Sequence, residues 1–185
     1  MKWNGWGYKD SSFVYKNGNL EFTGTRYPIG NLVLPYFTQW VSDKLGCDYS
    51  VKNEPIPTPN DSEYPEAHIE DEALLKQLDQ EGISNSLSGA DRLFRSHGHT
   101  LHDVYGLRTG HFPRLVDLVV WPKCHDDVIK LVRLASEYKA TLIPFGGGTS
   151  VTEALSVPEE EKRTVVSVDT SQMVRNGDLT ERNIY

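Results

Sequence analysis

Three short, mostly apolar runs occur in the last part of the chain. The first run, Leu115–Trp121, is rich in β-branched side chains and stops at Pro122, as a buried strand does, because proline cannot donate a hydrogen bond to a sheet. Similar runs cover Thr141–Pro144 and Thr164–Val168. This pattern of hydrophobic positions predicts three strands.

A helix is predicted between the first two of these strands. Asp126 and Asp127 stand in its expected first turn, where the helix dipole favours negative charge. Apolar residues then recur three or four positions apart, which places them on one helical face; they are Val128, Leu131, Val132, Ala135 and Tyr138. Strand, helix and strand in this order predict a right-handed βαβ unit.

The first fifty residues predict a hairpin followed by a helix. The dipeptide Asn17-Gly18 separates two short apolar segments and is typical of the tight turn in a β-hairpin. Pro35 then opens a helix that Gly46 ends. Its expected apolar face contains Tyr36 or Phe37, Trp40, Val41 and Leu45. We expect Trp3, Trp6 and Tyr8 to pack on this helix in preference to forming an aromatic cage for a ligand.

A proline-rich segment, residues 50–67, leads to two further helical patterns. Its four prolines stand among polar neighbours, which predicts an extended surface connector. Helical spacing resumes over Ile69–Gln80, which Gly82 can end, and again over Leu101–Leu107. We therefore expect a mixed, mainly helical segment ahead of the three strands.

Composition and charge narrow the functional classes. The chain has 185 residues, of which 38% are hydrophobic and 24% charged, an ordinary balance for a globular protein with a sizeable core. Its net charge of -7 argues against a nucleic-acid-binding surface, since phosphate backbones attract basic patches. No apolar stretch is long enough for a transmembrane helix. The two cysteines, Cys47 and Cys124, are too few for a disulfide framework and indicate a reducing compartment.

The second predicted strand runs into a glycine-rich loop. Glycine adopts positive φ without a steric clash, so three in succession can turn their N–H groups toward one point. Such a concavity binds anions. The loop contains hydroxyl donors but no Lys or Arg, so the expected guest is a phosphate or pyrophosphate held by neutral donors. The segment reads Pro144, Phe145, Gly146, Gly147, Gly148, Thr149 and Ser150.

This glycine loop differs from two common phosphate-binding motifs. It is not Gly-x-Gly-x-x-Gly at the start of a helix, which disfavours a Rossmann dinucleotide fold. It is not a P-loop either, because Lys followed by Ser or Thr does not succeed the glycines. A flexible turn at the end of a strand is the alternative interpretation.

Three histidines raise the question of a metal site. His97, His99 and His102 lie close in sequence, and a His-x-His pair with a third histidine could bind zinc. Asp103 is adjacent, but the sequence places no cysteine or clear fourth ligand beside them. We therefore favour a polar, anion-contacting or surface role for the histidines and predict no metal site.

Arginines near the histidines allow two interpretations. Arg92, Arg95 and Arg108 could complement an anionic substrate. Arginine on a helix surface more often forms solvated ion pairs. The sequence alone leaves both open.

Several unusual short strings occur in a characteristic order: residues 2–8, 26–28, 95–99, 117–128, 144–151 and 167–173. Together they resemble the alkylglycerone-phosphate synthase (alkyl-dihydroxyacetone-phosphate synthase) family, the flavoproteins of ether-lipid synthesis. The glycine loop alone would indicate only the wider flavin-binding superfamily of vanillyl-alcohol oxidase and p-cresol methylhydroxylase (PCMH).

This resemblance implies an α+β fold and a cofactor. The fold would be the first part of a PCMH-type FAD-binding domain, and residues Pro144–Ser150 would contact FAD. Family members exchange the acyl chain of acyl-dihydroxyacetone phosphate for a fatty alcohol in peroxisomes, with a flavin that does not shuttle electrons overall. A homodimer and peripheral association with a membrane are also compatible with the family.

The resemblance also implies how the chain is organised. Residues 1–111 would be a family-specific N-terminal segment, and residues 112–185 a partial PCMH-type FAD-binding domain. The match stops after Met173, before the family's substrate cap, so we assign no catalytic residue. We expect a fragment that is inactive alone and binds FAD weakly. A non-catalytic truncated isoform or interaction module, and another FAD oxidoreductase of the same superfamily, remain alternatives.

Overall fold

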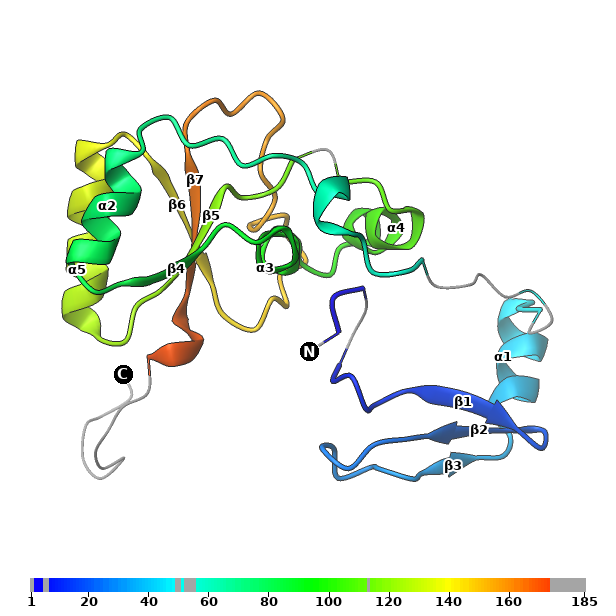
Figure 1. Ribbon diagram of the computed structural model, residues 1–185. Coiled ribbons are helices and arrows are strands. Elements are labelled where there is room, and N and C mark those ends of the chain that lie inside the picture. The colour runs from blue at the N-terminus through cyan, green and yellow to red at the C-terminus, as the bar shows by residue number, and fades with distance from the viewer. Residues whose placement is uncertain (1, 5–6, 49–50, 52–55, 113, 174–185) are drawn as a thin grey trace, which may run out of the picture. The chain divides into compact units, whose positions relative to one another are not determined.

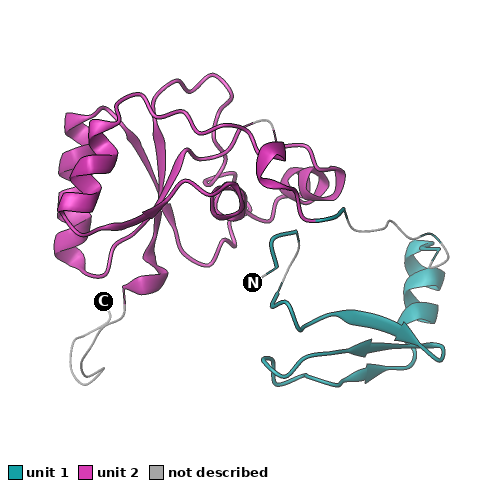
Figure 2. Cartoon of the chain, viewed as in Figure 1, with its two compact units in different colours: residues 1–57 teal, residues 58–185 magenta. Residues whose placement is uncertain are grey.

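The computed structural model describes residues 2–4, 7–48, 51, 56–112 and 114–173. Figure 1 shows its helices and strands, and Figure 2 shows its two compact units, Met1–Pro57 and Thr58–Tyr185. Residues 58–111 therefore belong to the same compact unit as the strands that follow them. The boundary at residue 112 was expected from the family resemblance, and the division into compact units does not test it, so it stays a prediction.

A three-stranded antiparallel sheet forms the first unit together with one helix. Strands β1 (Phe13–Lys16), β2 (Asn19–Phe22) and β3 (Val33–Leu34) pair in the order β1-β2-β3. The turn between β1 and β2 contains Asn17 at φ 50° and Gly18 at φ 83°, as a type I′ turn requires. The predicted hairpin is confirmed, whereas β3 was not predicted.

Helix α1 (Phe37–Leu45) follows, and Gly46 caps it in the left-handed region at φ 65°. The predicted helix and cap are confirmed, but most of its expected apolar face is not covered within the described residues: Val41 is buried, whereas Trp40 is 55% exposed. Tyr8 packs on the ring of Tyr27, with centroids 5.4 Å apart. The expected packing of Trp3 and Tyr8 on α1 stays a prediction. Trp6 lies outside the described residues.

The second unit is built on a four-stranded sheet of order β4-β5-β7-β6. Strands β5 (Leu118–Trp121), β7 (Val165–Asp169) and β6 (Thr141–Phe145) are parallel, and β4 (Ser84–Ser86) pairs antiparallel with β5. The three predicted strands are confirmed. Strand β4 was missed because its Ser-Asn-Ser sequence lacks an apolar run.

Two helices cover one face of this sheet. Helix α5 (His125–Glu137) links β5 to β6, and α2 (Ala73–Gln80) lies beside it (Figure 1). Successive strand residues point to opposite faces, so alternate positions of β5 and β7 meet these helices. The resulting core contains Leu74, Leu78, Ile83, Leu118, Val120, Leu131, Leu134, Val166 and Val168. Val132, expected on the inner face of α5, is 56% exposed, and the unpredicted Leu134 is buried instead.

The opposite face packs a smaller cluster of Val116, Val119, Val157 and Val165. Helix α3 (Gly89–Phe94) contacts β5, and α4 (Leu101–Thr109) follows it. The helix predicted over residues 101–107 is therefore present, with a capping box between Thr100 and Asp103. Of its apolar residues, Leu107 is buried while Leu101 is 89% exposed.

The proline-rich segment and the start of α2 differ from the sequence pattern. Residues Asp61–Glu63 form a 3-10 turn, η1, and Tyr64 after it is buried. Helix α2 begins at Ala73 rather than Ile69, because hydrogen bonds hold the preceding backbone elsewhere. His68 N donates to Asp117 Oδ1 at 2.8 Å, and Glu70 N donates to Thr164 Oγ1 at 2.8 Å.

Candidate functional site: the carboxyl edge of the parallel sheet

The carboxyl ends of β5, β6 and β7 lie at the same edge of the sheet, because the three strands are parallel. In open α/β sheets, ligands bind outside this edge. The glycine loop begins where β6 ends, at Phe145, and a second 3-10 turn, η2 (Thr170–Gln172), begins where β7 ends. The fold thus places the predicted cofactor-binding residues, Pro144–Ser150, at the edge where a ligand is expected.

The backbone conformation and the packing at position 148 both require a glycine. It adopts φ 68°, and a Cβ at this position would come within 3.0 Å of Cζ of the buried Phe145 ring. Of the three glycines, Gly148 alone adopts positive φ.

Gly146 and Gly147 have a different reason to lack side chains. Both are exposed. A Cβ on Gly146 would meet nothing within 4 Å, and one on Gly147 would meet only Thr149 Cγ2, at 3.8 Å. Packing within the described residues therefore leaves room for a side chain at both positions. A ligand that approaches the backbone closely would explain why neither position has one.

The N–H groups of the three glycines are the candidate ligand donors of this loop. Across the described ranges of the chain, no residue accepts a hydrogen bond from the N–H of Gly146, Gly147 or Gly148. Unpaired main-chain donors in a turn are what an anion-binding concavity requires. The residues present fit the diphosphate of a nucleotide cofactor such as FAD.

The His-Gly-His turn packs directly against the end of this loop. His99 N donates to the carbonyl of Ser150 at 2.6 Å. A Cβ on Gly98 would collide with the same carbonyl oxygen. The sequence pattern did not predict this contact, because His99 and Ser150 lie 51 positions apart in the chain.

An arginine–aspartate pair joins the ends of the parallel strands. Arg95 Nε donates to Asp169 Oδ2 at 2.8 Å, and Trp121 Nε1 donates to the same oxygen at 3.1 Å. The Arg95 guanidinium also lies over the Trp121 ring, 4.9 Å from its centroid. Burial would raise the pKa of Asp169, but hydrogen bonds from Ser171 and Arg95 outweigh it, so this pKa lies below its ordinary value.

One interpretation of the sequence was that Arg92, Arg95 and Arg108 form solvated ion pairs on a helix surface. For Arg92 and Arg95 this interpretation is wrong. Arg92 is 3% exposed and donates to the carbonyls of Val116 and Pro65, each at 2.8 Å. Burial lowers its pKa. Arg108 alone of the three is exposed. Helix α3, which was not predicted, packs on the sheet. This packing buries Arg92 and leaves only 12% of the Arg95 side chain exposed.

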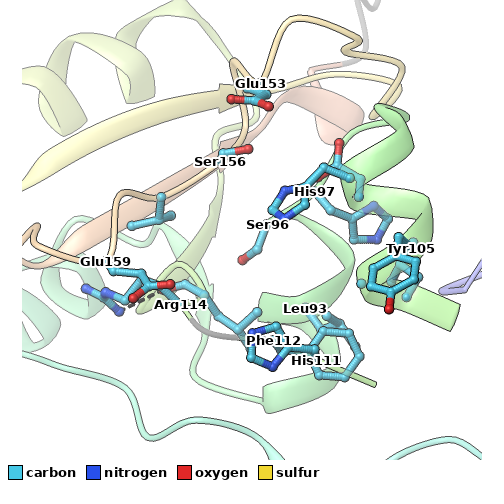
Figure 3. A pocket seen from close by; sticks show the side chains of 16 residues that line it. Leu93, Ser96, His97, Tyr105, His111, Phe112, Arg114, Glu153, Ser156 and Glu159 are labelled. Carbon is cyan, nitrogen blue, oxygen red and sulfur yellow. Dashed lines mark hydrogen bonds between the residues drawn. The ribbon is translucent and has the colours of Figure 1, made fainter. Parts of the chain in front are cut away.

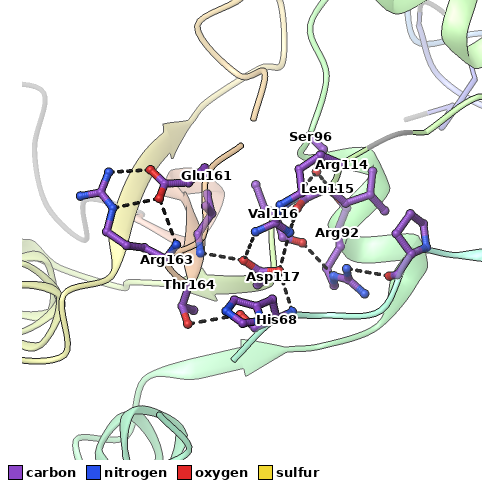
Figure 4. Close-up of polar contacts among 12 residues, drawn as sticks. His68, Arg92, Ser96, Arg114, Leu115, Val116, Asp117, Glu161, Arg163 and Thr164 are labelled. Carbon is purple, nitrogen blue, oxygen red and sulfur yellow. Dashed lines mark hydrogen bonds and ion pairs between the residues drawn. The ribbon is translucent and has the colours of Figure 1, made fainter. Parts of the chain in front are cut away.

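A second polar network lies at the amino end of the strands (Figure 4). Asp117 is fully buried and accepts two hydrogen bonds from Arg114, at 2.6 and 2.7 Å. It also accepts hydrogen bonds from the N–H groups of His68 and Val165, each at 2.8 Å. The hydrogen bond to Asp117 raises the pKa of Arg114. Because every partner is internal, this network fastens residues 65–70 to the sheet and does not form a binding site.

A cavity of about 350 Å³ lies on the side of the His-Gly-His turn where α3, α4 and residues 153–159 meet (Figure 3). Its lining includes Leu93, His97, Leu107, Leu115 and Val157. Nε2 of His97 is buried there without a hydrogen-bond partner in the described structure, whereas Nδ1 lies 3.0 Å from the Gly98 carbonyl. The described residues contain no cluster suited to a metal ion.

Comparisons with known proteins show what the chain is similar to. Residues 116–184 match the family profile "FAD binding domain". The chain is 44% identical over 170 residues to alkyldihydroxyacetonephosphate synthase of Caenorhabditis elegans, a match that covers 91% of the chain and 28% of that protein. The chain is a homologue of alkyldihydroxyacetonephosphate synthase. The family resemblance and the FAD cofactor expected from the sequence are thereby confirmed.

More distant relatives and solved structures extend the comparison. The synthase of Trypanosoma brucei brucei is 28% identical over 185 residues, covering 95% of this chain and 29% of that protein. Two solved structures of alkyldihydroxyacetonephosphate synthase share the fold, with TM-scores of 0.74 and 0.76 at 23% and 22% identity. They match 94% of this chain, which covers 33% and 32% of theirs. The expected α+β fold is confirmed.

The chain thus spans less than a third of the length of the curated relatives named above. Among the helices in the described ranges, none combines the length and hydrophobicity needed to cross a bilayer.

Proposed function

We propose that this chain supplies the loop that binds the FAD diphosphate in an alkyldihydroxyacetonephosphate synthase-type enzyme. The observation that carries the proposal is the loop at Gly146–Gly148, whose N–H groups have no acceptor among the described residues and whose first two glycines leave space for a ligand. Gly146–Gly148 would hold the diphosphate by main-chain donors, and the hydroxyls of Thr149 and Ser150 would add side-chain donors.

The whole enzyme's reaction would be the exchange of an acyl chain for a fatty alcohol on acyl-dihydroxyacetone phosphate, a step of ether-lipid synthesis. When bound, FAD supplies the organic chemistry, and the protein supplies binding, orientation and electrostatics. We assign to this chain the binding step alone. A peroxisomal location, a homodimer and a peripheral membrane contact are further parts of this proposal, supported by the homology.

The 185-residue chain alone should bind FAD weakly and exchange no lipid, because it spans 28% of the Caenorhabditis elegans relative. The test is a titration of FAD followed by quenching of flavin fluorescence, with ADP and riboflavin as competitors. If the loop binds the diphosphate, ADP displaces FAD and riboflavin, which has no phosphate, does not. Displacement by riboflavin as effective as that by ADP, or no FAD binding at millimolar concentration, would contradict the proposal.

A further inference from the structure

The segment from Arg95 to His99 contacts both ends of the glycine loop. At the far end, the Ser150 carbonyl accepts the N–H of His99 at 2.6 Å. Gly98 lies so close to this carbonyl that a Cβ there would collide with it. Since Gly98 does not adopt positive φ, the contact with Ser150, not backbone strain, requires a glycine at this position.

The near end of the loop is held by side chains. The buried Phe145 ring lies 5.8 Å from the ring of Phe94 and 5.9 Å from the Arg95 guanidinium. Arg95 is itself fixed by Asp169 at 2.8 Å and by Asp91 at 3.1 Å. Its side chain is only 12% exposed, so it cannot move freely into solvent.

Between these two attachments lie the residues whose N–H groups have no acceptor in the described structure, Gly146–Gly148. A loop that is fixed at both ends loses less conformational entropy when it binds a ligand than a free loop does. Fixing the ends of the loop therefore favours binding by its middle.

We propose that Arg95, Gly98 and His99 are positioning residues for the cofactor, which hold the glycine loop in its binding conformation through Phe145 and Ser150. They act on the loop and need not touch FAD. The proposal rests on the proposed FAD-binding function, and it adds a segment that lies before the FAD binding domain profile, which begins at residue 116.

The experiment compares Gly98→Ala with Gly106→Ala in the 185-residue chain. Gly106 lies in the neighbouring helix α4, and a Cβ there would come no closer than 3.2 Å, to the His111 carbonyl. Two quantities are measured: the FAD dissociation constant by flavin fluorescence, and the backbone amide chemical shifts of residues 145–150 without ligand. Amide shifts of β4, which β5 and β7 separate from β6 and the loop in the sheet order, report whether the sheet is intact.

Gly98→Ala should weaken FAD binding at least tenfold and move the loop amide signals, while the β4 signals stay in place. Gly106→Ala should change FAD binding less than twofold and leave the loop signals unmoved. Wild-type FAD affinity and unmoved loop signals in Gly98→Ala would overturn the proposal. If the wild-type chain binds no FAD, the proposed function fails, and the loop signals alone still decide whether Gly98 positions the loop.

If Gly98→Ala does not fold, hydrogen exchange in the wild-type chain decides. The His99 amide should then exchange as slowly as amides in the sheet, because its hydrogen bond to Ser150 holds it closed. Exchange of the His99 amide at the rate of an unprotected amide would overturn the proposal.

Discussion

Gly146 and Gly148 stand two residues apart but differ in what an added methyl group would meet. At Gly148 it would approach the Phe145 ring and the backbone has φ 68°, whereas at Gly146 it would meet open space. Gly→Ala substitutions at these two positions can therefore separate the effect on stability from the effect on FAD binding.

Gly148→Ala should destabilise the second unit by about 1–2 kcal/mol, because a left-handed conformation carries this cost for residues with a Cβ. Gly146→Ala should change the free energy of unfolding by less than about 0.5 kcal/mol but weaken FAD binding at least tenfold. Urea unfolding followed by β7 amide signals measures the first quantity, and flavin fluorescence the second. Unaltered FAD binding in Gly146→Ala would mean that the ligand does not approach this backbone.

Asp169 makes a second residue-scale prediction, which concerns pH. Its pKa is lowered in the folded chain, so its contribution to stability is present above the unfolded pKa of about 4 and is lost as pH falls through the folded pKa. Asp169→Asn should cost about 3 kcal/mol at pH 7, since Arg95 loses its buried partner. The difference in the free energy of unfolding between wild type and Asp169→Asn should shrink as pH falls below about 5 and through the folded pKa of Asp169.

Glu161→Gln is the control for this pH experiment. Hydrogen bonds from Arg163 lower the pKa of Glu161 to about 2. The Arg163 side chain of this ion pair is 55% exposed, so water screens the pair and Glu161→Gln should cost far less than Asp169→Asn. An equal loss in the two variants, or a stability difference for Asp169→Asn that grows as pH falls, would contradict the account of Asp169.

At the scale of elements, α5 contributes Leu131 and Leu134 to the core that it forms with β5 and β7. Leu134 is 2% exposed, whereas Val132, two positions earlier on the same helix, is 56% exposed. Leu134→Ala should lower the free energy of unfolding by about 2–5 kcal/mol through a lost contact and a cavity. Val132→Ala should change it by less than about 0.5 kcal/mol. Comparable losses in urea unfolding would show that the register of α5 on the sheet is wrong.

Elements with a strong local pattern could be predicted from the sequence. The apolar runs of β5, β6 and β7, the Asn17-Gly18 turn and the acidic first turn of α5 each carry a local physical signal, and each was found. Strand β4 and helix α3 carry weak signals, since β4 reads Ser-Asn-Ser and α3 is six residues long. Their structure depends on pairing and packing with distant segments, which spacing along the chain does not show.

The same distinction applies to the candidate site. The glycine loop was found because three successive glycines are a local signal, although only Gly148 needs positive φ. The buried roles of Arg92 and Arg95, the contact of Gly98 with Ser150 and the network around Asp117 were not found. Each joins segments far apart in sequence. The sequence did offer one signal for Asp169: it is an acidic residue at the end of a predicted strand, and in the structure it ends β7 at the carboxyl edge of the sheet.

At the scale of the whole molecule, the homology assigns a cofactor to a chain that covers less than a third of its relatives. The central claim is that the main-chain donors of one loop receive the diphosphate of FAD. This claim concerns particular N–H groups, so it can be tested on those groups without the complete enzyme and without turnover.

The most direct measurement is a titration of the chain, labelled with ¹⁵N-glycine, with FAD and then with ADP. The sequence contains 15 glycines, so the spectrum is simple enough to assign. We predict that the amide signals of Gly146, Gly147 and Gly148 move most with both ligands, while Gly18 and Gly46 in the first unit do not move. Saturation with FAD that leaves the three loop signals in place would contradict the account.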